Sequence, residues 1–247
     1  MTNLISSPDG SVCSTPLRAI ASLSPLIIVV LMITVLCNAQ EAAPLTSVGG
    51  TNAAASGGPG EQTLATHKNE FGFWAGGSLG LASALGGSRD RKIPLLIGLR
   101  YGRVLAAGKY AALEYTFDII PVALVSGPEG GFSNPGGVAS AGSGRDYVYG
   151  AGFVPVGFKL FVGPEHRVKP YLTVSSGPFY FTKQVPVPDS AHFNFISTAG
   201  GGVQVFVASR GAIFIEYRVG HLSNAGVGNL NPGFNSSTIH LGFSVFR

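Results

Sequence analysis

From Asn69 onward, apolar and polar residues alternate with period two, in segments bounded by Gly, Pro, Asn and Asp. This alternation is typical of β-strands whose two faces meet different surroundings. It predicts eight strands, at about 69–81, 93–106, 109–125, 147–162, 170–182, 192–207, 212–222 and 236–246. Pro155 and Gly157 fall within the fourth segment and predict a bulge or kink there.

The predicted connections alternate in length. Long ones fall near 82–92, 126–146, 183–191 and 223–235, and short ones at 107–108, 163–169 and 208–211. Bacterial outer-membrane barrels have an even number of strands, with short periplasmic turns and longer extracellular loops. The alternation therefore predicts a barrel of this kind, with both ends of the chain on the periplasmic side.

The two faces of the predicted strands differ in polarity. In the seventh strand the residues of one face are all large and mostly apolar: Ile213, Ile215, Tyr217 and Val219. The opposite face includes Glu216 and Arg218, and the third and eighth strands repeat this division. A barrel surrounded by lipid has its apolar face outside, whereas a lipocalin-like soluble barrel has the reverse arrangement.

Composition favours the membrane alternative. Only 11% of the residues are charged and 45% are hydrophobic, so there are too few polar side chains to coat a soluble exterior. The same numbers argue against intrinsic disorder and against an ordinary cytosolic enzyme. The predicted fold class is all-β, an eight-stranded antiparallel transmembrane β-barrel. We expect aromatic girdles at the membrane interfaces, formed by Trp74, Tyr101, Tyr147, Tyr149, Tyr171 and Tyr180.

The N-terminal region has the layout of an export signal. Arg18 precedes an apolar run, Leu26 to Cys37, which ends at the small-residue site Cys37-Asn38-Ala39. The run is short for a membrane anchor, the alternative interpretation. We predict a signal peptide over 1–39, a flexible lead-in over 40–66 and the barrel over 67–247. Both cysteines would leave with the signal, and no residue spacing indicates a metal. The net charge of +4 comes without a long basic run, so nucleic acid is not indicated.

The candidate chemistry lies at the end of the seventh strand. By parity, His221 and Ser223 continue its apolar face. A histidine on a hydrocarbon face is costly, but its imidazole is suited to act as a general base for a serine nucleophile. Asn224 and the backbone N–H groups near Gly226 could stabilise an oxyanion. The alternative is that His221 and Ser223 simply end a strand and begin a polar loop.

The segment His221-Leu222-Ser223-Asn224-Ala225-Gly226, followed by Asn231-Pro232-Gly233-Phe234-Asn235-Ser236, resembles the motif of the outer-membrane lipid A 3-O-deacylases, which are PagL-like members of the acyloxyacyl hydrolase family. The close resemblance covers Glu216 to Arg247. It implies a serine esterase of the bacterial outer membrane that acts on lipid A in lipopolysaccharide. His221 would be the base and Ser223 the nucleophile, with Asn224 and Gly226 at the oxyanion hole. It implies no cofactor, and a homodimer is left open.

One residue departs from the family pattern. The best-known members place a Glu after the motif to orient the histidine, and the matching residue here is Asn235. An Asn can hold an imidazole tautomer by hydrogen bonding, but it stabilises the imidazolium less than a carboxylate does. The protein would use Asn235, recruit another acid, be slow, or be inactive. Glu216 points into the lumen by parity, where we expect it to pair with Arg218 or Lys159.

The departure at Asn235 keeps a second hypothesis open: a small non-catalytic barrel with a structural or adhesion role. His240 falls on the lumen row of the eighth strand, where a structural role is expected.

Overall fold

A computed structural model describes residues 63–78, 90–134 and 144–247. All eight predicted strands are present: β1 (Asn69–Gly77), β2 (Lys92–Ala107), β3 (Ala111–Pro128), β4 (Arg145–Val162), β5 (Val168–Val185), β6 (Ala191–Phe206), β7 (Gly211–Ser223) and β8 (Phe234–Phe246). Residues 79–81, predicted to end the first strand, lie outside the described residues. The other strand ends differ from the prediction by at most three residues.

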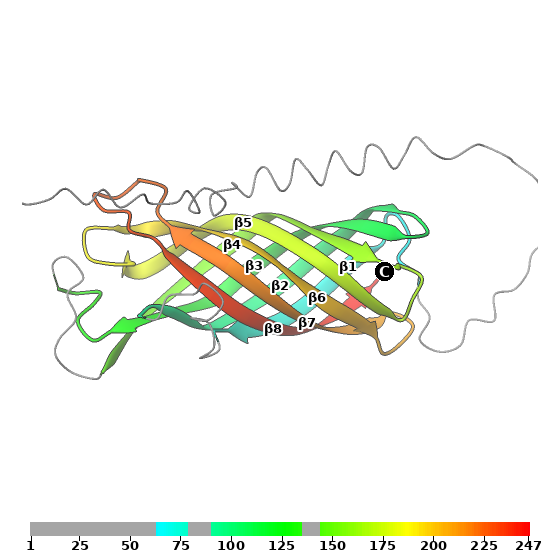
Figure 1. Cartoon of the computed structure of the whole chain (residues 1–247), viewed down its shortest axis with the longest axis horizontal. Helices are drawn as coiled ribbons and strands as arrows, with labels where there is room; N and C mark the ends of the chain where they lie inside the picture. Colours follow the sequence, from blue (N-terminus) through cyan, green and yellow to red (C-terminus); the bar gives the residue numbers. More distant parts are fainter. Residues whose placement is uncertain (1–62, 79–89, 135–143) are drawn as a thin grey trace, which may run out of the picture. The chain divides into compact units, whose positions relative to one another are not determined.

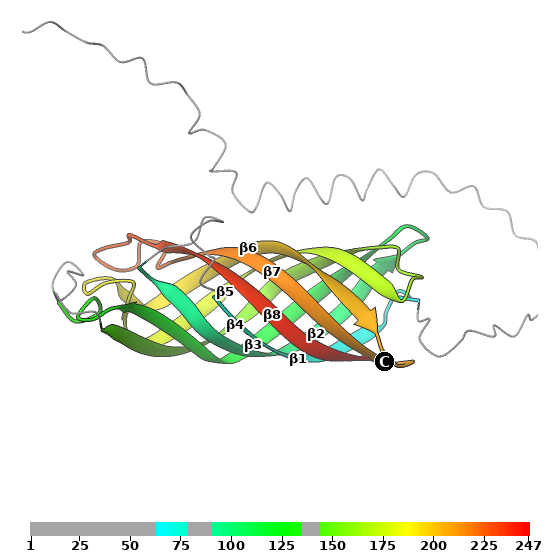
Figure 2. The same cartoon turned by 60° about the horizontal axis from the view of Figure 1, so that its bottom comes forward.

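The strands form a closed antiparallel barrel in sequence order, with β1 paired to β8 (Figures 1 and 2). This confirms the predicted fold. The turn end of the barrel carries the β2–β3, β4–β5 and β6–β7 connections, and the C-terminus lies there (Figure 1). The loop end carries the other connections. Among the described residues, no helix is long and apolar enough to cross a membrane.

Two local predictions can be compared with the strand register. The bulge expected in the fourth strand is confirmed, because Thr116 pairs with Gly157 whereas Asp118 pairs with Val154, so β4 has one extra residue there. The prediction of a long connection over 183–191 is wrong. Val185 still pairs with Ala191, so only 186–190 connect β5 to β6, no more than the 163–167 turn.

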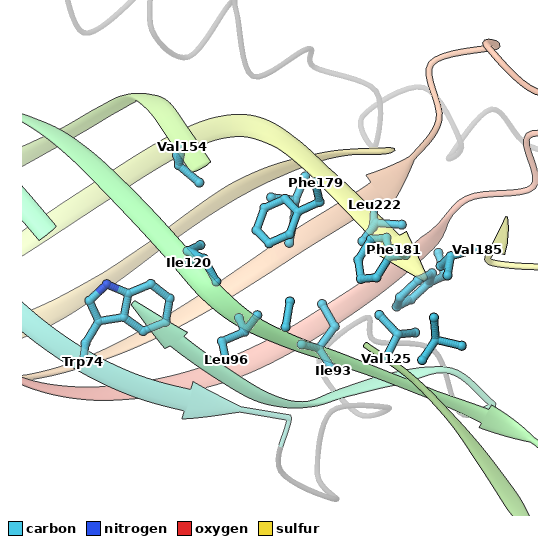
Figure 3. Close-up of a cluster of buried hydrophobic side chains, with 14 of the residues drawn as sticks. Trp74, Ile93, Leu96, Ile120, Val125, Val154, Phe179, Phe181, Val185 and Leu222 are labelled. Carbon is cyan, nitrogen blue, oxygen red and sulfur yellow. The ribbon is translucent and has the colours of Figure 1, made fainter. Parts of the chain in front are cut away.

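The two faces divide as the alternation predicts. In β7, Ile213 is 49% exposed and points outward, whereas Phe214 is 3% exposed and points into the lumen. Along β3, Ala112 belongs to an apolar cluster near the turn end and Ile120 to a second one toward the loop end, with Glu114 and Asp118 buried between them. The lumen is therefore filled with side chains, polar in its middle and apolar toward both ends. Figure 3 shows part of the second cluster.

The aromatic prediction is wrong for two residues. Trp74 is 1% exposed and lies in the lumen, stacked on His240, where its partner Gly98 on β2 leaves room for the ring. Tyr171 is also buried there, and its hydroxyl donates a hydrogen bond to Glu216 Oε2 at 2.9 Å. The outward, exposed positions of Tyr147, Tyr149 and Tyr180 agree with the prediction.

The predicted signal peptide, 1–39, lies outside the described residues and stays a prediction. The last residues of the predicted lead-in belong to the fold. Leu64 is buried in the turn-end cluster, and its backbone N–H donates to the carbonyl oxygen of Pro164 at 3.1 Å. The fold therefore includes residues that precede the predicted boundary at 67.

Candidate active site

The end of β7 is held in its orientation by Leu222. This side chain is 1% exposed, lies within the apolar cluster shown in Figure 3, and is the cross-strand partner of the buried Phe234 of β8. Since successive residues of a strand point to opposite faces, Leu222 in the lumen places His221 and Ser223 on the outer face. The predicted placement of both residues is confirmed.

His221 has a side-chain partner on the next strand. It faces Asn235 of β8, and His221 Nδ1 lies 2.8 Å from Asn235 Oδ1. An amide oxygen can only accept, so the shared hydrogen is on Nδ1, and in the neutral imidazole the lone pair is then on Nε2. This is the tautomer that a general base needs when a third residue orients it. Both side chains are exposed on the outer face.

Ser223 lies on the same face, two residues further along β7, and is half-buried. No hydrogen bond joins its hydroxyl to His221 in the described structure. Catalytic hydrogen bonds are often long before substrate binds and shorten in the complex. The structure therefore brings His221 and Asn235 into contact and leaves Ser223 as their same-face neighbour.

The loop after Ser223 is built around Asn224. Its side chain is fully buried, donating from Nδ2 to Leu230 O at 2.7 Å and accepting from Gly226 N at 2.9 Å. Val227 N donates to Asn224 O at 3.0 Å, and φ is 52° at Ala225 and 82° at Gly226, so the four residues form a tight turn. The oxyanion role of Asn224 and Gly226 stays a prediction, because in this structure their amide donors hold the turn.

Two residues of the β7–β8 connection reach the site although the sequence analysis assigned them no role. Asn231 Oδ1 accepts from the backbone N–H of Asn224 at 3.0 Å. Gly233 has φ of 56°, and a Cβ there would lie 2.8 Å from His221 Cε1 and 2.9 Å from Nε2. The tripeptide Asn231-Pro232-Gly233 is a recognisable turn signal, but its contact with the imidazole cannot be deduced from spacing.

Comparison with known proteins now bears on this geometry. The sequence matches the family described as "Lipid A 3-O-deacylase (PagL)" over residues 109–244, more than half of the chain and all of the site. The chain belongs to this family. A comparison with curated proteins found no match.

Three solved structures are among those that the chain is similar to. The outer membrane enzyme PagL is 14% identical, with 71% of this chain and 98% of that chain covered and a TM-score of 0.42. Ail of Yersinia pestis is 11% identical (74% and 99% covered, TM-score 0.39). OprG of Pseudomonas aeruginosa is 7% identical (75% and 98% covered, TM-score 0.43).

As a member of the PagL family, the barrel is a bacterial outer-membrane protein. Its outer face is therefore the lipid-facing wall, and its loop end is the extracellular end expected for such barrels. His221, Ser223 and Asn235 lie on that wall near the loop end. This is where a side chain can reach a lipid ester while remaining close to the polar headgroup region.

Glu216 does not take the place of the missing family carboxylate. It points into the lumen, 2.8 Å from Arg218 Nη2 and 3.1 Å from His240 Nδ1. The expected pairing with Arg218 is confirmed. The alternative pairing with Lys159 is wrong, because Lys159 lies 2.7 Å from Glu70 Oε2 instead. In the described part of the chain, no group of three His, Cys, Asp or Glu side chains could hold a metal ion.

Proposed function

We propose that this barrel hydrolyses an ester-linked acyl chain of lipid A, with Ser223 as nucleophile, His221 as general base and Asn235 as the residue that orients His221. The observation that carries the proposal is the bond from His221 Nδ1 to Asn235 Oδ1, 2.8 Å long, on the lipid-facing wall. A polar pair on such a wall is costly. The His221–Asn235 pair lies beside Ser223 within the motif of a deacylase family, where it can activate the serine as a nucleophile.

In the proposed reaction, the Ser223 hydroxyl attacks the ester carbonyl while its proton passes to His221 Nε2. The tetrahedral intermediate collapses, and the sugar oxygen leaves with the proton that His221 returns. Water, deprotonated by the same imidazole, then hydrolyses the acyl-serine ester. The products are a free fatty acid and a lipid A molecule with one more hydroxyl group.

The negative oxygen of the intermediate requires hydrogen-bond donors. We keep Asn224 and Gly226 as candidates, and we add the amide nitrogen of Asn231. Asn231 Oδ1 is fixed by the backbone of Asn224, so its Nδ2 has a defined place beside the site. The backbone N–H of Gly226 donates to Asn224 Oδ1 and that of Asn224 donates to Asn231 Oδ1, so either one would reach substrate only after its present bond breaks.

Mass spectrometry of lipid A tests the proposal. The wild type and Ser223→Ala are expressed in a host that makes fully acylated lipid A. The wild type should produce lipid A that lacks one acyl chain, and Ser223→Ala should not. Ser133→Ala, which changes an exposed serine of the β3–β4 connection, is the matched control and should behave as the wild type.

Identical spectra for wild type and Ser223→Ala, with both proteins folded in the membrane, would contradict the proposal. That result would favour the second hypothesis, a non-catalytic outer-membrane barrel with a structural or adhesion role.

A further inference from the structure

Positive charge gathers at the turn end of the barrel. The described residues beyond the strand ends there include a single acidic residue, Glu165, and several lysine and arginine residues: Lys68, Lys109, Arg167, Arg210 and Arg247. Three of these cations, Lys68, Arg210 and Arg247, line a cavity of about 410 Å³ together with Phe246. Part of the excess positive charge therefore surrounds a space large enough for a ligand.

Backbone hydrogen bonds hold the three cationic residues around this space, which we call the rim cavity. Phe246 N donates to Arg210 O at 2.8 Å, and Arg247 N donates to the carbonyl oxygen of Asn69, the residue after Lys68, at 2.9 Å. The rim cavity therefore lies over the end of β8, between the β6–β7 turn and the start of β1, at the end of the barrel marked C in Figure 1. Phe246 is buried in the turn-end cluster and gives the rim cavity an apolar floor.

The positive charges around the rim cavity are not neutralised within the described part of the chain. Lys68 and Arg210 form no ion pair with any carboxylate of the described residues, including the one that ends the chain at Arg247. Lys68 Nζ donates only to a neutral acceptor there, the carbonyl oxygen of Thr63, at 3.3 Å. Burial lowers the pKa of Lys68, and the like charge of Arg210 lowers this pKa further. An anion between the two side chains would relieve their repulsion and attract both.

We propose that the rim cavity binds the phosphate group of a phospholipid from the periplasmic leaflet of the membrane, through Lys68, Arg210 and Arg247. Ammonium and guanidinium groups form charge-assisted hydrogen bonds with phosphate oxygens. A water molecule takes about 30 Å³ in the liquid, so the rim cavity has room for roughly a dozen heavy atoms. This is more than a free phosphate ion fills, and it suits a phosphate that carries glycerol.

The position of the rim cavity favours a lipid over a soluble anion. By the alternation of β1 and β8, Lys68 is on the lumen face and Arg247 is on the outer face, so the cavity lies across the end of the wall. Beside it, the outer face of the same two strands carries the exposed rings of Phe71, Phe73 and Phe243. A phospholipid with its phosphate in the rim cavity can therefore lay its acyl chains along this apolar wall.

The test titrates the detergent-solubilised barrel with phosphatidylglycerol, whose one charge is its phosphate, and follows bound lipid by native mass spectrometry. Lys68→Gln/Arg210→Gln should weaken the apparent affinity about tenfold or more. The matched control, Lys109→Gln/Arg167→Gln, removes the same charge from the same end of the barrel, away from the rim cavity, and should stay within about twofold of the wild type. Equal losses in the two double variants would overturn the proposal, because binding would then follow net charge alone.

Two competitors separate the possible ligands. Diacylglycerol with the same acyl chains lacks the phosphate and should not displace the lipid, whereas inorganic phosphate should displace it only at a far higher concentration. Displacement by diacylglycerol at equal concentration would overturn phosphate recognition, and equally effective displacement by inorganic phosphate would overturn the assignment to a lipid. Heat-modifiable gel mobility checks the fold of each variant, and Arg210→Gln alone, at an exposed position, should still weaken binding. Ser223→Ala should bind the lipid as the wild type does, so this result is independent of the proposed hydrolysis.

Discussion

His240 and His221 occupy adjacent strands of one barrel and point to opposite faces. His240, in the lumen, is enclosed by partners: Nδ1 lies 3.1 Å from Glu216, Nε2 lies 2.9 Å from Thr238, and the ring stacks on Trp74. His221, on the lipid-facing wall, has one hydrogen-bond partner among the described residues, Asn235, and its Nε2 side is bordered by Gly233.

The difference separates a structural histidine from one that can act. With both nitrogens bonded and the ring stacked, His240 has no position left for a reacting atom. His221 is bonded at Nδ1, and within the described residues its Nε2 has no hydrogen-bond partner, which is the arrangement that a general base requires.

The largest expected effect follows from removing the outer imidazole. His221→Ala should reduce acyl-chain release at least ~10³-fold, because it removes the general base from a unit whose members act together. Folding should be unaffected, since the side chain is exposed. Fatty-acid release by the refolded barrel measures the activity, and heat-modifiable gel mobility checks the fold.

His192→Ala is the control for that experiment. His192 lies near the loop end of β6, outside the proposed site, with its Nδ1 2.9 Å from Phe181 O. Its loss should leave activity within about twofold. Equal losses for His192→Ala and His221→Ala would show that the effect is general rather than located at the site.

The second prediction addresses the lumen. Glu216→Ala should lower the free energy of unfolding by about 3–5 kcal/mol, because the buried Arg218 would lose its carboxylate partner, whereas Arg100 would keep Asp118. Urea unfolding in lipid vesicles measures it. Activity per folded molecule should stay near that of the wild type. A Glu216→Ala variant that is stable but inactive would show that Glu216 takes part in the reaction. The lumen would then not be purely structural.

The sequence alone predicts most of this division, for a physical reason. Period two fixes the face of every strand residue, so Ile213 is outward, Glu216 is inward and His221 is outward without any knowledge of the neighbours. Trp74 obeys the same rule, because Phe71 and Phe73 point outward and Trp74 between them points inward. The interface prediction for Trp74 is wrong because it rests on residue type, whereas Gly98 on β2 leaves room for the ring in the lumen.

Contacts across the site were predictable only in part. Residue type and parity make His221 and Ser223 candidates, and the roles proposed for them and for Asn235 follow from the family resemblance. The contact of Gly233 with the imidazole and the bond of Asn231 to Asn224 depend on how the loop closes. Loop closure follows no periodicity, and it is set by individual turns such as the one at Ala225 and Gly226.

The third prediction concerns Asn235, the partner of His221, which lacks the charge of the Glu found in the best-known family members. Asn235→Asp keeps the acceptor at the same place and adds a charge that stabilises the imidazolium, so activity should rise about tenfold. Asn235→Ala should lower it about tenfold, because the ring loses its orienting bond. Initial rates of fatty-acid release decide between them. If Asp and Ala lower activity alike, a different group orients His221.

The smallest expected effect comes from the loop that borders the ring. Gly233→Ala should reduce activity about three- to tenfold, because the added Cβ would fall within 3 Å of the imidazole and the ring must shift. Alanine also costs ~1 kcal/mol at positive φ, which by itself lowers stability and not turnover. Gly130→Ala, at φ of 75° in the β3–β4 connection, carries the same backbone cost away from the site. Both variants should lose similar stability by urea unfolding, and only Gly233→Ala should lose rate. Equal rates for Gly233→Ala and Gly130→Ala would contradict this prediction. They would mean that a shift of the His221 ring does not affect the rate.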